Sequence, residues 1–338
     1  MTEDRESSPS PPREDPTGPD GSDRHIPVGV SSCLLGQEVR FDGGHKKNDF
    51  VTATLAPFVR WIPVCPELEV GMGIPREALR LVRAEETIRL EANRSGRDWT
   101  DAMERFSGTR VEALRAERLR GFVLKKGSPT CGLERVRVYA ESGQSCLREG
   151  RGLWAQALAR SFPHLPLEEE GRLQDPRLRE NFVTRIFAHD RWLRLRKTQP
   201  GPGDLVAFHT AHKMLLLAHS PRHYRELGPL VAQAGRASLP ELLDRYEETF
   251  MAALSQLSTR GRHCNVLQHL IGYLEDDLPQ QDRDELHRTL AEYRAGWVPL
   301  VTPLVLLRSY LKRLDHRWIE AQHYLDPYPR VLGLRSEI

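Results

Sequence analysis

Three short apolar segments, each followed by a loop that carries a cysteine, constrain the fold of this chain more than any other feature. They are residues 26–32 before Cys33, residues 61–64 before Cys65, and residues 121–125 before Cys131. Strand-like segments that alternate with helical patterns are typical of a parallel α/β sheet. Because ligands of such sheets bind outside the carboxyl ends of the strands, we expect the three cysteines to lie on that edge.

The segments between these cysteines supply the other elements of an α/β domain. Residues 48–59 predict a helix that Asn48 caps, and residues 79–90 predict a β-hairpin. Residues 98–119 and 152–161 show the apolar spacing of helices. The predicted fold class of the first half is therefore α/β with a parallel sheet.

The second half of the chain is predicted to be entirely helical. Residues 204–338 contain a succession of helical patterns and few strand signals. They follow residues 171–203, in which eight arginines and lysines stand against three acids before Pro200 and Gly203 break the helix. The predicted organisation is an α/β domain (26–170), a basic linker helix (171–203) and an all-α domain (204–338).

Composition excludes several classes of protein. The chain has 338 residues, of which 39% are hydrophobic and 28% charged, and its net charge is +2. A membrane helix needs about 18 successive apolar residues, and the best candidate stops at Arg308, short of that length. Residues 1–25 lack the apolar stretch of a secretory signal and are rich in proline, serine and acids, so we expect a disordered cytoplasmic tail.

The five cysteines are odd in number and widely spaced, which does not fit a disulfide framework. Three thiolates on parallel loops are one short of the four ligands of a structural zinc site. They also suit an iron–sulfur cluster, in which three cysteines leave one iron open to a substrate. Spacing alone does not separate these sites from cysteines that merely pack. Cys146 and Cys264 belong to no such loop and are expected to be reduced thiols that bind no metal.

Longer motifs surround the three cysteines. Residues 29–36 read Gly-Val-Ser-Ser-Cys-Leu-Leu-Gly, residues 63–67 read Pro-Val-Cys-Pro-Glu, and residues 124–132 read Leu-Lys-Lys-Gly-Ser-Pro-Thr-Cys-Gly. In this order they resemble the three cysteine motifs of the thiouracil desulfidase (TudS-like) family, over residues 26–165. The chain departs from the family's usual Gly-Gly-Leu-Pro at residues 71–75, Gly-Met-Gly-Ile-Pro, which affects the shape of a loop.

This resemblance implies both a cofactor and a reaction. The fold is expected to be α/β and to carry a 4Fe–4S cluster on Cys33, Cys65 and Cys131. The activity implied by the family is removal of sulfur from thiolated pyrimidines without net oxidation or reduction.

The helical half resembles the YbgA-type domain through three further segments. They are residues 208–213 (Phe-His-Thr-Ala-His-Lys), residues 265–273 (Asn-Val-Leu-Gln-His-Leu-Ile-Gly-Tyr) and residues 293–300 (Tyr-Arg-Ala-Gly-Trp-Val-Pro-Leu). Together the two halves resemble the two-domain tRNA thiouridine desulfidase (RudS-like) group. That resemblance implies that the substrate is 4-thiouridine in tRNA and that the products are uridine and sulfide.

Two polar residues near the cysteines are candidates for proton transfer in such a reaction. Glu67 lies two residues after Cys65, and a carboxylate there suits a general acid or base. Ser128, three residues before Cys131, matches a serine implicated near the cluster of the resembling family. Alternatively, Glu67 caps a helix or faces solvent, and Ser128 shapes the turn before Pro129.

The basic helix at residues 177–197 is the candidate RNA-binding surface. Arg185, Arg191, Arg194 and Lys197 are predicted to contact phosphates, with a solvated charged face as the alternative. Two further charged residues, Arg40 and Asp42, follow the first cysteine and are expected to pair with each other, with contact to a base edge or a phosphate as the alternative.

Four histidines of the helical half have the spacing of metal ligands on one helix face. They are His209, His212, His219 and His223. No acidic or thiolate partner accompanies them, so polar surface or contact with RNA is favoured over zinc.

Three functions stay open on the sequence alone. The first is cluster-dependent desulfuration of thiouridine in tRNA. The second is the same chemistry on small thiolated pyrimidines, namely free thiouracil or thiouridine monophosphate. The third is a non-catalytic iron–sulfur protein that binds RNA. None of them requires a membrane.

Overall fold

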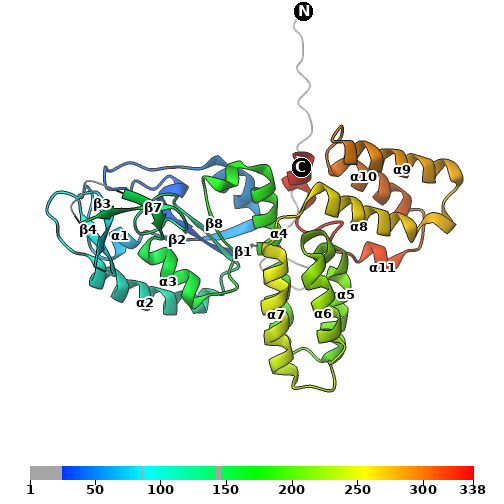
Figure 1. Cartoon of the computed structure of the whole chain (residues 1–338), viewed down its shortest axis with the longest axis horizontal. Helices are drawn as coiled ribbons and strands as arrows, with labels where there is room; N and C mark the ends of the chain where they lie inside the picture. The colour runs from blue at the N-terminus through cyan, green and yellow to red at the C-terminus, as the bar shows by residue number, and fades with distance from the viewer. Residues whose placement is uncertain (1–24, 86, 142–145) are drawn as a thin grey trace, which may run out of the picture.

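The computed structural model describes residues 25–85, 87–141 and 146–338. Within these residues the chain forms an α/β domain and a helical domain, which the long helix α4 joins (Figure 1). The predicted tail at residues 1–25 lies outside the described residues except for its last position. Among the residues described, no helix combines the length and the apolar character that crossing a membrane requires.

Four parallel strands form the sheet that carries the cysteine loops. Their order is β2-β1-β5-β8, and each neighbouring pair is parallel, as predicted. The strands are β1 (Ile26–Ser31), β2 (Val59–Val64), β5 (Gly121–Leu124) and β8 (Leu167–Glu169). A Cβ at Gly29 of β1 would lie 2.1 Å from the ring of Phe122 on β5, so this position requires glycine.

Both faces of this sheet are covered, which explains why its central strands are apolar at almost every position. One face packs on α2 (Thr100–Glu117) and α3 (Leu153–Ser161), with Phe122 and Trp154 in its core. The other face packs on α4 (Pro176–Lys197) and on a carboxyl-terminal segment that includes Tyr328 and Leu334. The end of the helical domain therefore helps to cover the α/β domain.

A second, mixed sheet has the strand order β4-β3-β6-β7. The predicted hairpin is confirmed, since β3 (Leu79–Ala84) and β4 (Thr87–Ala92) pair in antiparallel fashion. The other two strands, β6 (Val136–Ala140) and β7 (Cys146–Gly150), are not among the predicted elements. The sequence of β6 carries a weak strand signal, the alternation of valine with arginine, and these valines are buried while the arginine is exposed. β7 carries no such alternation, since it is exposed over most of its length.

The helix predicted at residues 48–59 is only partly correct. The segment forms a π-helical turn (Phe50–Leu55) and a 3₁₀ turn (Ala56–Phe58) in place of a regular α-helix. Asn48 does cap it, because its side-chain oxygen accepts a hydrogen bond from the backbone N–H of Val51 at 3.1 Å. Pro57 lacks the N–H that a longer helix would need, so the helix does not continue into β2.

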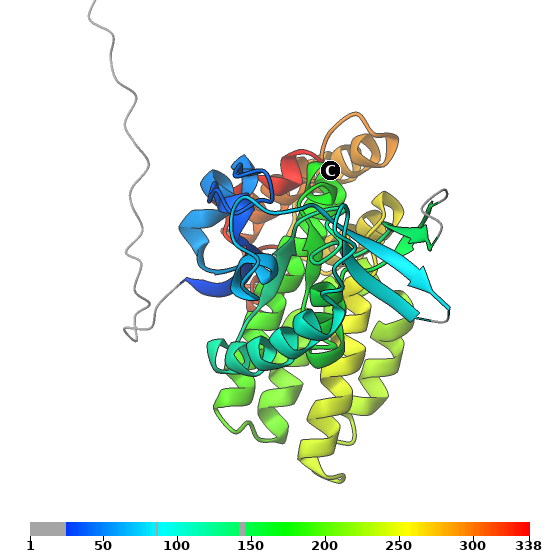
Figure 2. The ribbon, with the colours of Figure 1, turned by 90° about the vertical axis from the view of Figure 1, so that its left-hand side faces the viewer.

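The second half of the described chain is all-α, as predicted. Its helices after α4 are α5 (Pro202–His219), α6 (Pro221–Val231), α7 (Leu239–Ser255), α8 (Arg260–Gly272), α9 (Gln280–Ala295), α10 (Val301–Leu311) and α11 (Arg317–Glu320). Helices α5 to α7 project away from the sheet as one group, and α8 to α10 form another (Figures 1 and 2). The predicted break separates α4 from α5 but is shorter than predicted, since Pro202 and Gly203 already belong to the first turn of α5.

Candidate functional site

The loops that follow β1, β2 and β5 enclose a cavity of about 300 Å³. Cys33, Cys65 and Cys131 all line this cavity, and all three are free thiols. Cys33 and Cys131 are buried, whereas Cys65 is half-buried. The structure thus brings the three predicted cysteines together at the carboxyl edge of the sheet.

Local hydrogen bonds hold each cysteine in place. Cys33 lies in a 3₁₀ turn (Ser32–Leu35), and its carbonyl oxygen accepts a bond from the backbone N–H of Lys46 at 2.9 Å. The backbone N–H of Cys65 donates to the side chain of Glu69 at 2.9 Å at the start of the short helix α1 (Pro66–Glu69). Cys131 donates its N–H to the side chain of Ser128 at 3.1 Å. The thiols are therefore positioned by ordered loops.

Burial raises the pKa of all three thiols. For Cys33 it raises the pKa to about 11, although the positive charge of Lys125 opposes the shift. Burial likewise raises the pKa of Cys65 and of Cys131, with the carboxylate of Glu67 adding to both shifts. Thiolates are the metal-binding form, so a cationic group in this cavity is needed to hold the three sulfurs deprotonated.

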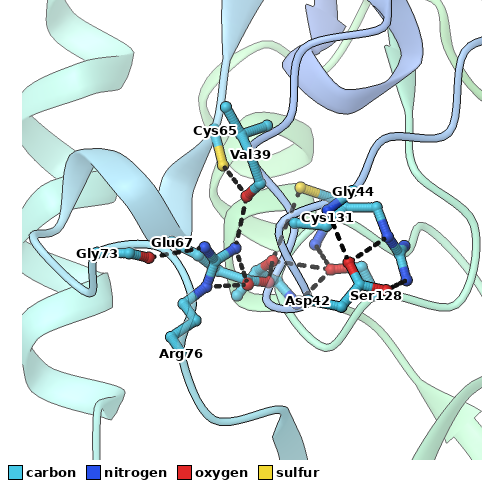
Figure 3. Close-up of polar contacts among 11 residues, drawn as sticks. Val39, Asp42, Gly44, Cys65, Glu67, Gly73, Arg76, Ser128 and Cys131 are labelled. Carbon is cyan, nitrogen blue, oxygen red and sulfur yellow. Dashed lines mark hydrogen bonds and ion pairs between the residues drawn. The ribbon is translucent and has the colours of Figure 1, made fainter.

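Glu67 lies in the wall of the cavity and is held from two sides (Figure 3). The guanidinium of Arg76 donates to its Oε2 through Nη2 at 2.7 Å and through Nε at 3.0 Å. The hydroxyl of Thr130 donates to its Oε1 at 2.8 Å. Glu67 is thus an ordered carboxylate at the cavity, and not an exposed loop residue or only a helix cap.

Ser128 takes part in the same network and also shapes the turn. Its Oγ lies 2.8 Å from Oγ1 of Thr130 and accepts hydrogen bonds from the backbone N–H groups of Thr130 at 3.2 Å and Cys131 at 3.1 Å. A hydroxyl has one proton, and Thr130 donates its proton to Glu67. In the hydrogen bond between the two hydroxyls, Ser128 is therefore the donor and Thr130 the acceptor. A directed chain of hydroxyls therefore runs from Ser128 through Thr130 to Glu67.

Two members of this network, Arg76 and Thr130, were not assigned roles by sequence reasoning. Both stand next to recognised motifs, since Thr130 precedes Cys131 and Arg76 follows Pro75. Thr130 is completely buried, and Arg76 also donates to the carbonyl oxygen of Val39 at 2.9 Å. Only the folded loops show that both residues meet at Glu67.

The two charged residues after the first cysteine pair with each other, as predicted. Nε of Arg40 lies 3.3 Å from Oδ1 of Asp42, which also accepts the backbone N–H of Gly44 at 3.2 Å (Figure 3). Asp42 does not line the cavity, so it supports the loop.

The predicted basic face of α4 is wrong for two of its four residues, Arg185 and Arg191. The side chain of Arg185 is only 14% exposed and lies 3.9 Å from Glu168. Arg191 points into the helical domain, where its Nε donates to His212 at 3.1 Å and its Nη1 to the carbonyl oxygen of Pro327 at 2.9 Å. The reason is that α4 lies between the two domains and is covered on several sides.

The other two predicted RNA contacts lie near the end of α4. Arg194 is half exposed and forms an ion pair with Asp190 at 2.7 Å. Lys197 is exposed and forms no ion pair with another described residue. Their role in binding RNA stays a prediction.

Three of the four histidines do not form polar surface, contrary to expectation, whereas His223 is partly exposed and its Nδ1 lies 2.7 Å from Oγ of Ser220. His209, His212 and His219 are buried, and burial lowers the pKa of each. The Nδ1 of His212 lies 2.7 Å from the carbonyl oxygen of Phe208, and that of His219 lies 2.8 Å from the carbonyl oxygen of Gln256. They satisfy polar groups inside the helical core.

No group of three His, Cys, Asp or Glu side chains within the described residues is arranged to hold a single metal ion. Cys146 is exposed on β7 and Cys264 is buried in α8, and neither lines the cysteine cavity. That they bind no metal stays a prediction.

Comparison with known protein families covers both halves of the chain. The family model described as 2-thiouracil desulfurase matches residues 28–170, and the model of a protein family of unknown function, DUF1722, matches residues 213–329. The uncharacterised protein YbgA of Escherichia coli (strain K12) is 32% identical over 160 residues, which are 47% of this chain and 95% of YbgA. This chain belongs to the YbgA family, and its first half is similar to the 2-thiouracil desulfurase family.

Two further relatives match the desulfurase half. The uncharacterised protein YbbK of Bacillus subtilis (strain 168) is 29% identical over 108 residues, which are 30% of this chain and 71% of YbbK. The solved structure of the [4Fe-4S]-dependent thiouracil desulfidase TudS shows 30% sequence identity and a TM-score of 0.36. That match covers 44% of this chain and 93% of TudS.

The donor set of the cavity fits an iron–sulfur cluster. Three free thiols line one cavity, and each comes from a different loop at the same sheet edge. Thiolates are the ligands that iron–sulfur clusters take. The network of Arg76, Thr130 and Glu67 lies beside the sulfurs, and it contacts one of them through the hydroxyl of Thr130, which lies 3.7 Å from Sγ of Cys131.

Proposed function

We propose that this protein is a 4Fe–4S-dependent desulfidase that converts 4-thiouridine in tRNA to uridine and releases sulfide. The observation that carries the proposal is the cavity in which Cys33, Cys65 and Cys131 face the ordered carboxylate of Glu67. The match of residues 28–170 to the 2-thiouracil desulfurase model supports the reaction type, and the [4Fe-4S] dependence of TudS, which is 30% identical, supports the cofactor.

Cys33, Cys65 and Cys131 would hold the cluster. When bound, the cluster supplies an iron without a protein ligand, which acts as a Lewis acid toward the soft sulfur of a thiocarbonyl group. The net reaction replaces C=S with C=O by consuming one water, so it needs neither an oxidant nor a reductant.

The protein's own task is to handle the protons of that water. Glu67 lies at the cavity wall and is the residue we assign as proton acceptor, since the fork of Arg76 and the hydroxyl of Thr130 fix its two oxygens. The hydroxyl of Ser128 donates a hydrogen bond to Thr130 and accepts hydrogen bonds from two backbone N–H groups, so Ser128 positions Thr130 and Cys131. Ser128 is therefore proposed to affect the chemistry indirectly.

The size of the cavity bears on the substrate. A volume of about 300 Å³ accommodates a single pyrimidine base but excludes a folded RNA. A thiouridine in tRNA would therefore have to leave its stack to enter, as the target base does in other enzymes that act on nucleobases. The attached helical domain, which a reaction on a free base does not require, supports a larger substrate.

The proposal is tested with anaerobically reconstituted protein and three substrates: bulk tRNA that contains 4-thiouridine, 4-thiouridine monophosphate and 2-thiouracil. The thiolated base that remains is measured by chromatography and mass spectrometry. We expect loss of thiouridine from tRNA with a higher kcat/KM than for either small substrate. If the protein turns over only the small substrates, its substrate is a small thiolated pyrimidine and not tRNA. A full cluster without turnover of any substrate would favour a non-catalytic RNA-binding protein.

A further inference from the structure

A second, larger cavity lies at the opposite edge of the parallel sheet. It measures about 810 Å³ and is lined by both domains. Pro27 near the start of β1 and Arg120 just before β5 mark the amino-terminal edge of the sheet, and Asp190 of α4 and Glu247 of α7 form the facing wall. No role has been assigned to this interdomain cleft.

The lining of the interdomain cleft is strongly basic. Six arginine and lysine side chains face two acids, Asp190 and Glu247. Three histidines, His25, His164 and His189, complete the titratable groups of the lining. The six cations are Arg115, Arg118, Arg120, Arg194, Arg196 and Lys197.

Ion pairs neutralise a part of this charge. Arg115 pairs with Glu112 at 3.0 Å and Arg196 with Asp244 at 2.7 Å, and both acids lie outside the lining. Asp190 is shared by Arg120 at 2.8 Å and Arg194 at 2.7 Å. Glu247 lies 4.0 Å from His189. Arg118 and Lys197 are exposed and form no ion pair with any residue in the described part of the chain.

Helix ends explain only a part of this charge. Arg118 caps the carboxyl end of α2 and Lys197 is the last residue of α4, where the helix dipole favours cations. Each helix end carries only about half a negative charge, which one cation neutralises. About one positive charge of Arg118 and Lys197 therefore remains, and Arg120 and Arg194 share the single carboxylate of Asp190, so positive charge is available to an external anion.

We propose that the interdomain cleft binds backbone phosphates of the tRNA substrate, so this inference rests on the proposed function. The cysteine cavity follows the carboxyl ends of β1, β2 and β5, whereas the cleft lies at their amino ends. The six residues of β1 alone separate the two edges by roughly 20 Å. The phosphate of a mononucleotide lies one sugar away from its base, so only a polynucleotide reaches both places at once.

The interdomain cleft includes only some of the basic residues that the sequence predicts as RNA contacts on α4. Arg194 and Lys197 belong to it, together with Arg115 and Arg118 of the α/β domain. Arg185 is absent from its lining. A phosphate backbone held here contacts the two domains together, through the end of α2 and the end of α4.

The test is a double charge reversal in the full-length, reconstituted protein, Arg118→Glu with Lys197→Glu. The matched control is Arg288→Glu with Lys312→Glu, since both residues are exposed, lie away from the cleft and form no ion pair among the described residues. Two quantities are measured: the Kd for a fluorescent tRNA transcript without thiouridine, by anisotropy at several salt concentrations, and kcat/KM for 4-thiouridine monophosphate.

We expect the cleft variant to weaken tRNA binding about tenfold or more at low salt and to flatten its salt dependence, because phosphate contacts are lost. The control variant should bind as the parent does, and kcat/KM for the mononucleotide should be equal in all three proteins. Equal Kd values for the cleft and control variants would overturn the proposal. Because binding is measured without turnover, failure of the parent to desulfurate tRNA would instead reject the proposed function.

Discussion

The cysteine cavity and the histidine-bearing core of the helical domain look alike in sequence but differ completely in the folded chain. The histidines have the spacing of metal ligands on one helix face, and the cysteines lie in motifs that resemble those of cluster ligands. The cysteines lie on loops at a sheet edge and line one open cavity. His209 and His212 lie on one helix and are sealed against Tyr246 and Phe208. Loops at a sheet edge leave reactive groups accessible, whereas helix faces in a bundle bury them.

The polar partners differ in the same way. Around the cysteines, the hydroxyls of Ser128 and Thr130 point toward a carboxylate in the cavity wall. In the helical core, ring nitrogens satisfy backbone carbonyls and the hydroxyl of Tyr246. Substitutions in the first region should therefore change chemistry, and those in the second should change stability.

The largest effect is expected at the cavity itself. Cys33→Ala, Cys65→Ala or Cys131→Ala should each abolish desulfidase activity and lower the iron and sulfide content of the reconstituted protein. Cys146→Ala and Cys264→Ala serve as the exposed and the buried control, and both should retain cluster and activity. Circular dichroism reports whether each variant folds. A Cys65→Ala protein with parental iron content and activity would show that the cavity is not the cluster site.

The next effect concerns proton handling. Glu67→Gln should keep the cluster and slow turnover by on the order of 10² to 10⁴, because a proton acceptor is lost. Ser128→Ala should cost less, since Ser128 acts through Thr130. Asp42→Asn is the control, because Asp42 lies near the cavity without lining it. If Glu67→Gln binds a full cluster and keeps full activity, Glu67 is not the proton acceptor and only stabilises the loops around the cavity.

The smallest effect is expected in the helical core and depends on pH. Burial lowers the pKa of His209 to about 4, with Lys213 adding to the shift, whereas an unfolded histidine titrates near 6.5. Between these values the unfolded chain binds more protons, so stability falls as the pH is lowered from 6.5 toward 4. For His209 alone the free energy of unfolding should decrease by about 2 kcal/mol between pH 7 and pH 5.

Urea unfolding followed by circular dichroism at pH 5, 6 and 7 measures this effect. In His209→Gln the dependence of stability on pH should be weaker than in the parent. An identical pH dependence in the parent and in His209→Gln would show that His209 is already protonated or solvated in the folded protein.

Much of the fold and the central part of the site follow from sequence alone. Parallel strands end at one sheet edge, so three cysteines placed after three such strands have to gather there. The hairpin at β3 and β4, the break before α5 and the helical second half are equally local features, because turn residues and apolar spacing act within a few positions.

Only the tertiary structure decides which of several similar residues face solvent. The helical period predicts that Arg185 and Arg194 lie on one helix, but packing of α4 between two domains buries Arg185 and leaves Arg194 half exposed. Glu67 and Arg76 lie in the connection between β2 and β3, whereas Thr130 follows β5, and nothing in their spacing predicts that the three meet. Local periodicity specifies the elements of this chain, whereas contacts between distant segments specify which side chains are buried and which remain available for chemistry.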